Sequence, residues 1–251
     1  MPQAFWPNGI KAAVSLSFDD ALDSQLNNAL PLMNRRSIKG TFYVNPSRTT
    51  RWEEQIPKWQ AAASTGHEIG NHTTRHPCSC NYGFSEDYCL EQLTLDDIST
   101  TIDEAESILD QLFPDQRGRR SFCYPCYQSY VGAGSTRQSY VPLVAERFSI
   151  ARGGGERTNN PWIIDLSYTW AQDVSGFSGR QLIDYVEEAI DLHNWAILCM
   201  HGVGAEHLAV STEALTEIVD YLAENRDTLW TDTVFEIGTY IKSSRQKNPG
   251  S

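Results

Sequence analysis

The sequence lacks any long hydrophobic run. No stretch approaches the roughly 18 consecutive apolar residues that a membrane-spanning helix needs, so we expect no membrane span. The start of the chain, residues 1–9, also lacks the basic and apolar segments of a signal peptide. As it stands the chain is therefore expected to be cytoplasmic, with secretion after removal of a leader as the alternative.

Positive charge is also scarce. The 20 Lys and Arg residues are outnumbered by 32 Asp and Glu residues, which gives a formal net charge of −12. Because an acidic protein repels phosphate backbones, nucleic acid is an unfavourable partner. A neutral or cationic ligand is compatible with this charge, but the charge does not select one. An acidic balance mostly reflects a soluble surface. Oligomeric state is left open.

Low-complexity linkers and short repeats are absent, so nothing divides the 251 residues into several domains. Apolar residues make up 40% of the chain, enough for a full hydrophobic core. We therefore expect a single domain over residues 1–242, followed by a flexible polar tail over residues 243–251.

The six cysteines are not spread evenly enough for a disulfide scaffold, and packed, reduced thiols are the default expectation. Cys78, Cys80 and Cys89 are close enough for one local disulfide, which the sequence cannot settle. Cys123 and Cys126 have thioredoxin-like spacing. A redox pair would need that motif at a helix start, whereas a Gly- and Ser-containing loop follows, which disfavours a redox function.

Predicted strands alternate with predicted helices along the chain. Apolar runs predict strands at 13–18, 40–44, 67–70, 121–124, 149–151, 195–200 and 233–235, and amphipathic spacing predicts helices at 22–36, 52–64, 94–112, 142–147, 178–193 and 211–225, with a closing helix to residue 241. This order favours a mainly parallel sheet with helices outside. We predict an α/β barrel of about seven units, closed or slightly open, with its chemistry at the carboxyl ends of the strands.

Acidic and imidazole side chains follow several of these strands. His72 and His76 are four residues apart, so on a helical turn they would share one face and could bind one metal ion. Asp19 and Asp20 cannot both point the same way from a strand, and two adjacent carboxylates are costly without a cation. His201, after a buried run, is suited to act as a general acid near a metal.

Each of these residues also has an ordinary structural explanation. The two histidines of the 72–76 segment could be surface residues, and one aspartate could cap the following helix. His201 could be a satisfied core residue. The agreement of several such residues at strand ends is what favours a catalytic site.

Taken together, these segments resemble the polysaccharide deacetylases, the NodB-type catalytic domain of carbohydrate esterase family 4. The resemblance runs from about residue 11 to residue 242 and is carried by four motifs: Ser17-Phe-Asp-Asp20, His72-Thr-Thr-Arg-His76, Phe122-Cys-Tyr-Pro-Cys126 and Leu198-Cys-Met-His201. It implies a distorted (β/α) barrel and the hydrolysis of N-acetyl or O-acetyl groups on a carbohydrate.

The resemblance also implies roles for residues. Asp19 would be the general base toward a metal-bound water, and His201 the general acid. Asp20, His72 and His76 would hold one divalent metal ion, zinc first, with cobalt, manganese or nickel as alternatives.

Other positions are assigned less directly. The resemblance implies that the amide of Cys126 donates to the oxyanion, with Tyr127 beside it in the substrate site. Where many members carry Arg in the third motif this chain has Cys123, and Arg152 could supply the missing cation. The fourth motif matches poorly, with Trp170 and Asp173 as the nearest candidates.

Three other functions compete with the deacetylase interpretation. A ring-opening cyclic amide or imide amidohydrolase would use the same superfamily site, and an inactive relative would bind carbohydrate without turnover. Two histidines and one aspartate also suit a non-haem iron oxygenase, although such enzymes usually have all-β scaffolds. Chitin oligomers, peptidoglycan and acetylated xylan all stay open as substrates.

Overall fold

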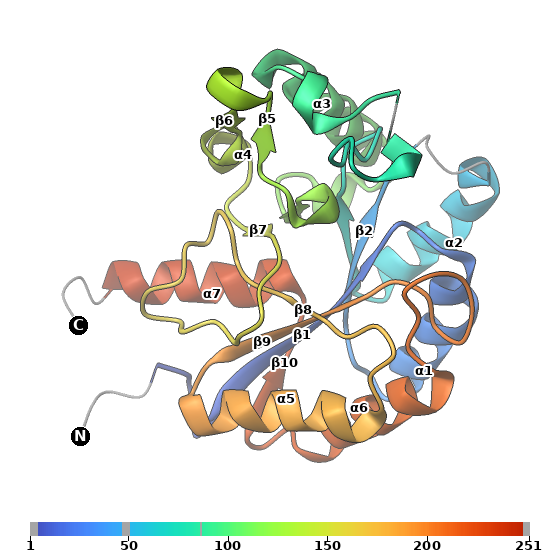
Figure 1. Ribbon diagram of the computed structural model, residues 1–251. Coiled ribbons are helices and arrows are strands. Elements are labelled where there is room, and N and C mark those ends of the chain that lie inside the picture. Colours follow the sequence, from blue (N-terminus) through green and yellow to red (C-terminus); the bar gives the residue numbers. More distant parts are fainter. Residues whose placement is uncertain (1–4, 47–50, 86, 248–251) are drawn as a thin grey trace.

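A curled parallel sheet surrounded by helices forms the molecule (Figure 1). The computed structural model describes residues 5–46, 51–85 and 87–247. The sheet runs in the order β7-β4-β3-β2-β1-β9-β8, and β10 pairs with the start of β1. Its strands are β1 (Ala12–Asp19), β2 (Thr41–Val44), β3 (Glu68–Asn71), β4 (Phe122–Cys123), β7 (Ala151–Arg152), β8 (Gln172–Asp173), β9 (Trp195–Met200) and β10 (Leu229–Thr231).

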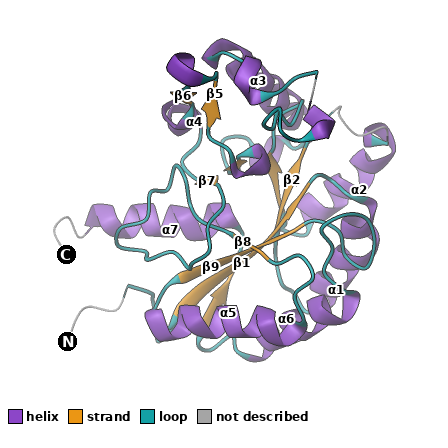
Figure 2. Ribbon diagram, in the orientation of Figure 1, coloured by secondary structure: helices purple, strands orange, loops and turns teal. Residues whose placement is uncertain are grey.

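Helices lie around the outside of this sheet, as Figure 2 shows. They are α1 (Leu30–Arg35), α2 (Trp52–Ser64), α3 (Leu95–Leu112), α4 (Val141–Arg147), α5 (Gly179–Leu192), α6 (Thr212–Glu224) and α7 (Val234–Lys247). A π-helical turn (Gln25–Ala29) leads into α1, and a small antiparallel hairpin, β5 (Tyr130–Val131) and β6 (Gln138–Ser139), lies outside the main sheet. The predicted single-domain α/β fold, a distorted barrel, is confirmed.

Strand β1 is the centre of the sheet, and every residue in it is buried. It pairs with β2 and β10 along one edge and with β9 along the other. Val14, Leu16 and Phe18 pack in the core with residues of the outer helices. Because alternate residues of a strand point to opposite faces, Asp19 is directed away from that layer, toward the barrel interior.

Side-chain capping fixes where two of the long helices begin. The Thr94 hydroxyl accepts a hydrogen bond from the amide of Asp97, and the Thr94 amide donates one to the Asp97 carboxylate, which is a capping box at the start of α3. Ser178 and Gln181 make the same arrangement at the start of α5. Both helices start within one residue of the predicted position.

The C-terminal unit differs from the prediction. Residues 233–235, expected to form a strand, begin helix α7, and the strand of this unit is β10 at 229–231. Thr233 stands at the helix start and its hydroxyl accepts from the amide of Glu236, so Val234 faces the core from a helix. Helix α7 also takes in residues 243–247 of the predicted flexible tail, and residues 248–251 lie outside the described residues.

Within the described ranges, no helix is long and apolar enough to cross a membrane.

Candidate active site

Asp19 and Asp20 stand at the carboxyl end of β1 and line the same cavity. The expectation that adjacent carboxylates of one strand diverge does not apply to this pair, because Asp20 lies just after the strand. Its backbone has φ +77°, and that of Ala21 has φ +54°, a left-handed turn that re-aims the second carboxylate. Neither aspartate caps a helix, since the helical residues that follow begin only at Asp23.

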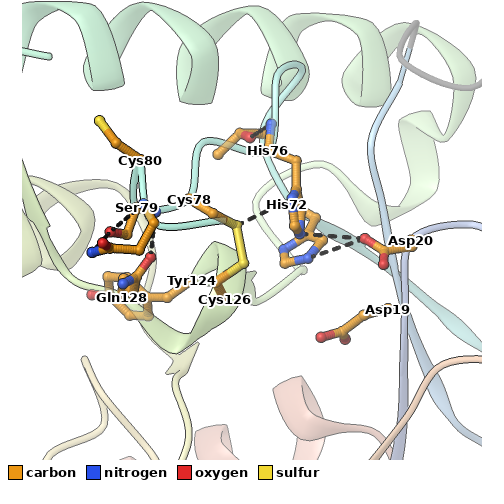
Figure 3. The surroundings of a disulfide bond; sticks show 12 residues. Asp19, Asp20, His72, His76, Cys78, Ser79, Cys80, Tyr124, Cys126 and Gln128 are labelled. Atoms are coloured by element: carbon orange, nitrogen blue, oxygen red, sulfur yellow. Dashed lines mark hydrogen bonds and ion pairs between the residues drawn. A yellow bond between two sulfur atoms is a disulfide. The ribbon is translucent and has the colours of Figure 1, made fainter. Parts of the chain in front are cut away.

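His72 and His76 reach Asp20 from the loop after β3, as Figure 3 shows. This loop is not the predicted helical turn: Thr73 and His76 have φ values of +61° and +46°. The Thr73 hydroxyl accepts a hydrogen bond from the His76 amide at 2.8 Å, and the Asn45 side chain donates to the His72 carbonyl at 2.6 Å. The loop is therefore held open in a fixed shape, and the two rings meet edge to face with centroids 4.7 Å apart.

The donor atoms of Asp20, His72 and His76 suit one metal ion. Asp20 Oδ1 lies 3.7 Å from His72 Nε2 and 3.4 Å from His76 Nε2, and all three donor atoms lie within 4.8 Å of one another. Tetrahedral bonds of about 2.1 Å separate neighbouring ligand atoms by about 3.4 Å, so the spacing fits zinc or a similar ion. The Cys123 carbonyl lies 2.9 Å from His72 Nδ1, which leaves Nε2 free to face the metal position.

Arg152 pairs with Asp19 in a fully buried contact. Its Nη2 lies 2.5 Å from both carboxylate oxygens, and the Arg152 side chain has no exposed surface. Two thiols, Cys123 and Cys199, contact the guanidinium at 2.6 and 3.4 Å. The small Cys123 leaves room for Arg152 to enter from β7. Arg152 therefore supplies a cation beside Asp19, as expected from the replacement of the motif arginine by Cys123.

Neighbouring charges, hydrogen bonds and burial shift the pKa values of Asp19, Asp20 and His72. Burial alone would raise the pKa of Asp19, but the Arg152 charge holds that pKa below its usual value. Burial would likewise raise the pKa of Asp20, and the hydrogen bond with His207 is the largest influence lowering it instead. Burial lowers the pKa of His72, so its ring is the neutral imidazole that a metal ligand must be.

Two further histidines reach this centre from the segment after β9. His201 Nε2 lies 4.0 Å from Asp19 Oδ2, and its Nδ1 is buried without a hydrogen-bond partner among the described residues. His207 Nε2 lies 3.2 Å from Asp20 Oδ2. No role was predicted for His207, because a histidine in a Gly-containing loop has no periodicity to fix its direction.

Disulfides join segments around the site. Cys78 is bonded to Cys126 and Cys80 to Cys89, so the expectation of reduced thiols holds only for Cys123 and Cys199. The local disulfide suggested by spacing is Cys80–Cys89. The Cys123/Cys126 redox pair is excluded, since Cys126 is bonded to another partner.

The Cys78–Cys126 disulfide stands beside the candidate metal ligands (Figure 3). Cys78 Sγ lies 3.5 Å from His76 Nδ1. On the other side of the bond, Cys126 has φ +50° and Tyr127 has φ +59°, so the chain turns sharply at the cavity wall. The Tyr127 hydroxyl donates to Cys199, and its ring lies 5.5 Å from the Arg152 guanidinium carbon.

The cavity has a volume of about 780 Å³, in the range of small-molecule sites. Its lining is made of Asp19, Asp20, Asn45, His76, Tyr82, Phe84, Cys126, Tyr127, Asp173, His201, His207 and Leu208. Trp170 is not among them: it is 41% exposed and packs over Gly155. Asp173, three residues after Trp170, does line the cavity. Tyr82 and Phe84, which also line it, were not predicted.

Comparisons with known proteins identify a family for this chain. The polysaccharide deacetylase family matches residues 7–132. The uncharacterized protein YlxY of Bacillus subtilis (strain 168) is 24% identical over 196 residues, which is 78% of this chain and 49% of that protein. The chain thus spans about half the length of this curated relative.

Two solved structures share the fold. A Mycobacterium smegmatis protein assigned to the polysaccharide deacetylases superposes with a TM-score of 0.68 at 15% identity, over 96% of this chain and 93% of that one. A family 4 acetyl xylan esterase from Clostridium thermocellum, solved with a cobalt ion, gives a TM-score of 0.55 at 20% identity over 90% of each chain. With the family match over half of its length, this chain belongs to the polysaccharide deacetylases.

Proposed function

We propose that this chain is a metal-dependent hydrolase that removes acetyl groups from a carbohydrate. The observation that carries the proposal is a three-ligand group, two members of which line the cavity, beside a carboxylate that lines the same cavity and is not one of the ligands. Asp20, His72 and His76 supply the ligand group, and Asp19 is the separate carboxylate.

The ligand group would hold one divalent cation, zinc first, with cobalt, manganese or nickel as alternatives. Two imidazoles and one carboxylate are a donor set that zinc accepts and that leaves a position for water or substrate. When bound, such an ion lowers the pKa of a coordinated water and polarises a carbonyl oxygen.

The remaining steps fall to side chains of this protein. Asp19, held ionised and oriented by Arg152, takes the proton of the attacking water. His201, on the Asp19 side of the cavity, would deliver a proton to the departing amine or alcohol oxygen. The Cys126 amide, on a left-handed turn at the cavity wall, is the proposed donor to the developing oxyanion.

The test combines metal content with acetate release. Purified protein would be assayed on chitooligosaccharides, peptidoglycan and acetylated xylan, each with and without chelator. We expect chelator-sensitive acetate release from at least one of them. Asp19→Asn should lower kcat by about 100- to 10,000-fold while keeping the metal, because a general base contributes about that much. His72→Ala should lose metal and activity together.

Asp184→Asn is the matched control, since Asp184 lies on the surface of α5 in an exposed ion pair that contributes little. It should leave both readouts unchanged. Bound metal with no acetate release, but hydrolysis of a cyclic imide, would replace the deacetylase with the amidohydrolase alternative. Absence of metal and of turnover would refute the ligand assignment.

A further inference from the structure

We propose that Tyr82 and Phe84 form a sugar-binding wall that stacks on a pyranose ring next to the acetylated one. This inference rests on the proposed deacetylase function and deepens it. It predicts that the protein acts on oligomers or polymers in preference to single acetylated sugars. The pair is called the aromatic wall below.

The aromatic wall is exposed at the cavity that contains the candidate catalytic residues. Tyr82 and Phe84 are 45% and 63% exposed, and their rings stack with centroids 5.3 Å apart and an interplanar angle of 24°. Both line the cavity that contains Asp19 and Asp20. Large apolar side chains left in contact with water beside a reaction centre are typical of a ligand surface.

The segment that carries the wall is held rigidly from both sides. Cys80–Cys89 closes it into a short loop, and Cys78–Cys126 fixes its start to the opposite cavity wall. Within the loop, the Glu91 carboxylate accepts from the Cys80 amide at 2.7 Å and also from the Ser79 hydroxyl. Because these bonds restrain the described ends of the segment before any ligand arrives, less conformational entropy is lost when a ring stacks on the aromatic wall.

The cavity has polar and apolar parts that match an acetylated sugar chain. Its ionisable groups are the candidate catalytic residues with His207 and Asp173, whereas the aromatic wall and the half-exposed Leu208 are apolar. A pyranose has an apolar C–H face that fits an aromatic ring, and the acetyl group is the part that must reach Asp19 and the ligand group. A volume of about 780 Å³ is near the upper end for small-molecule sites, which leaves room for more than one sugar ring.

The test compares the kinetics of acetate release from tetrasaccharides and from monosaccharides. Chitotetraose and acetylated xylotetraose would be compared with N-acetylglucosamine and acetylated xylose as substrates. Tyr82→Ala and Phe84→Ala should each raise KM for the active tetramer by about tenfold, with kcat within about twofold, because one lost ring contact of this kind has about that effect. Activity on the monosaccharide should not change. Tyr82→Phe, which keeps the ring, should behave as the unmodified protein.

Tyr130→Ala is the matched control, because Tyr130 is also 45% exposed but does not line the cavity. The Cys80→Ser/Cys89→Ser double variant should raise the tetramer KM as the alanine variants do. An unchanged tetramer KM in Tyr82→Ala and Phe84→Ala would overturn the inference and leave the deacetylase intact. No acetate release from any sugar by the unmodified protein would overturn the proposed function, and this inference with it.

Discussion

Arg152 and Asp19 form an ion pair from which water is almost fully excluded. Asp19 is 3% exposed and Arg152 is 0% exposed. A buried pair repays its desolvation only where the geometry is good, and removing one partner leaves an uncompensated charge. The pair is surrounded by two thiols and by the rings of Tyr43 and Tyr127, so these neighbours offer no second charge to replace a lost partner.

We therefore expect Arg152→Met to change the pH dependence of the enzyme. Asp19, the proposed base, could act only when ionised, and Arg152 lowers its pKa. Without that cation the pKa rises, so activity should be lost at a higher pH on the acidic side of the kcat/KM profile. The variant should also unfold more easily, by about 3–5 kcal/mol. Arg152→Lys, which keeps the charge, should shift the acidic limb less, and an acidic limb in Arg152→Met that coincides with that of the unmodified protein would contradict this role.

The sequence alone was enough to select those site residues that stand at the ends of predicted strands. Asp19, Asp20, His72 and His201 each follow a buried run, and parallel strands bring such positions to one edge. Arg152 was selected only because a cation was needed. The directions of His207 and Tyr82 are set by left-handed backbone and by disulfides in loops, and no periodicity in a sequence encodes those.

At the scale of elements, the Cys78–Cys126 bond joins the loop after β3 to the loop after β4. One carries His76 and the other carries the proposed oxyanion donor. Cys78 lies two residues after His76 and contacts its ring nitrogen. The bond therefore limits how far the proposed metal ligand His76 and the cavity wall can move apart.

The Cys78→Ser/Cys126→Ser variant should consequently bind metal more weakly. We expect a loss of about 10- to 100-fold in affinity, as for other groups that orient metal ligands, measured by competition with a chromophoric chelator. Removing a cross-link over 48 residues also costs up to about 4 kcal/mol, so folding must be checked at the assay temperature. Cys80→Ser/Cys89→Ser is the control, and equal loss of affinity in both variants would show a general effect of disulfide removal.

Most elements were predicted within a residue or two because their patterns are strong. Helices α2 and α3 carry long amphipathic spacing, and β9 is a continuous apolar run between polar neighbours. The misassigned residues 233–235 are a short apolar group that suits a strand or a helix equally well. What decided between them was the pairing of β10 with β1, a contact more than two hundred residues apart in sequence.

At the scale of the whole molecule, metal binding should raise the free energy of unfolding and the Tm. An ion that binds only the folded chain adds about 2.7 kcal/mol at 100 times its Kd, a rise of roughly 5–10 °C in Tm for a protein of this size. His76→Ala should abolish most of this rise, measured by calorimetry with and without zinc. His193→Asn, the control, removes an exposed histidine at the end of α5 and should leave the zinc-induced rise in Tm unchanged. A rise in His76→Ala as large as in the unmodified protein would place the ion elsewhere.

The two disulfides also decide how a sample of this protein must be produced. The cytosol of common expression hosts is kept reducing, and such bonds rarely persist there. Protein purified from it would have a loosened aromatic wall and a weakened ligand loop, and a blank acetate assay would wrongly suggest a pseudoenzyme. Counting thiols under denaturing conditions guards against that error: the intact molecule has two free cysteines, Cys123 and Cys199, whereas the reduced chain has six.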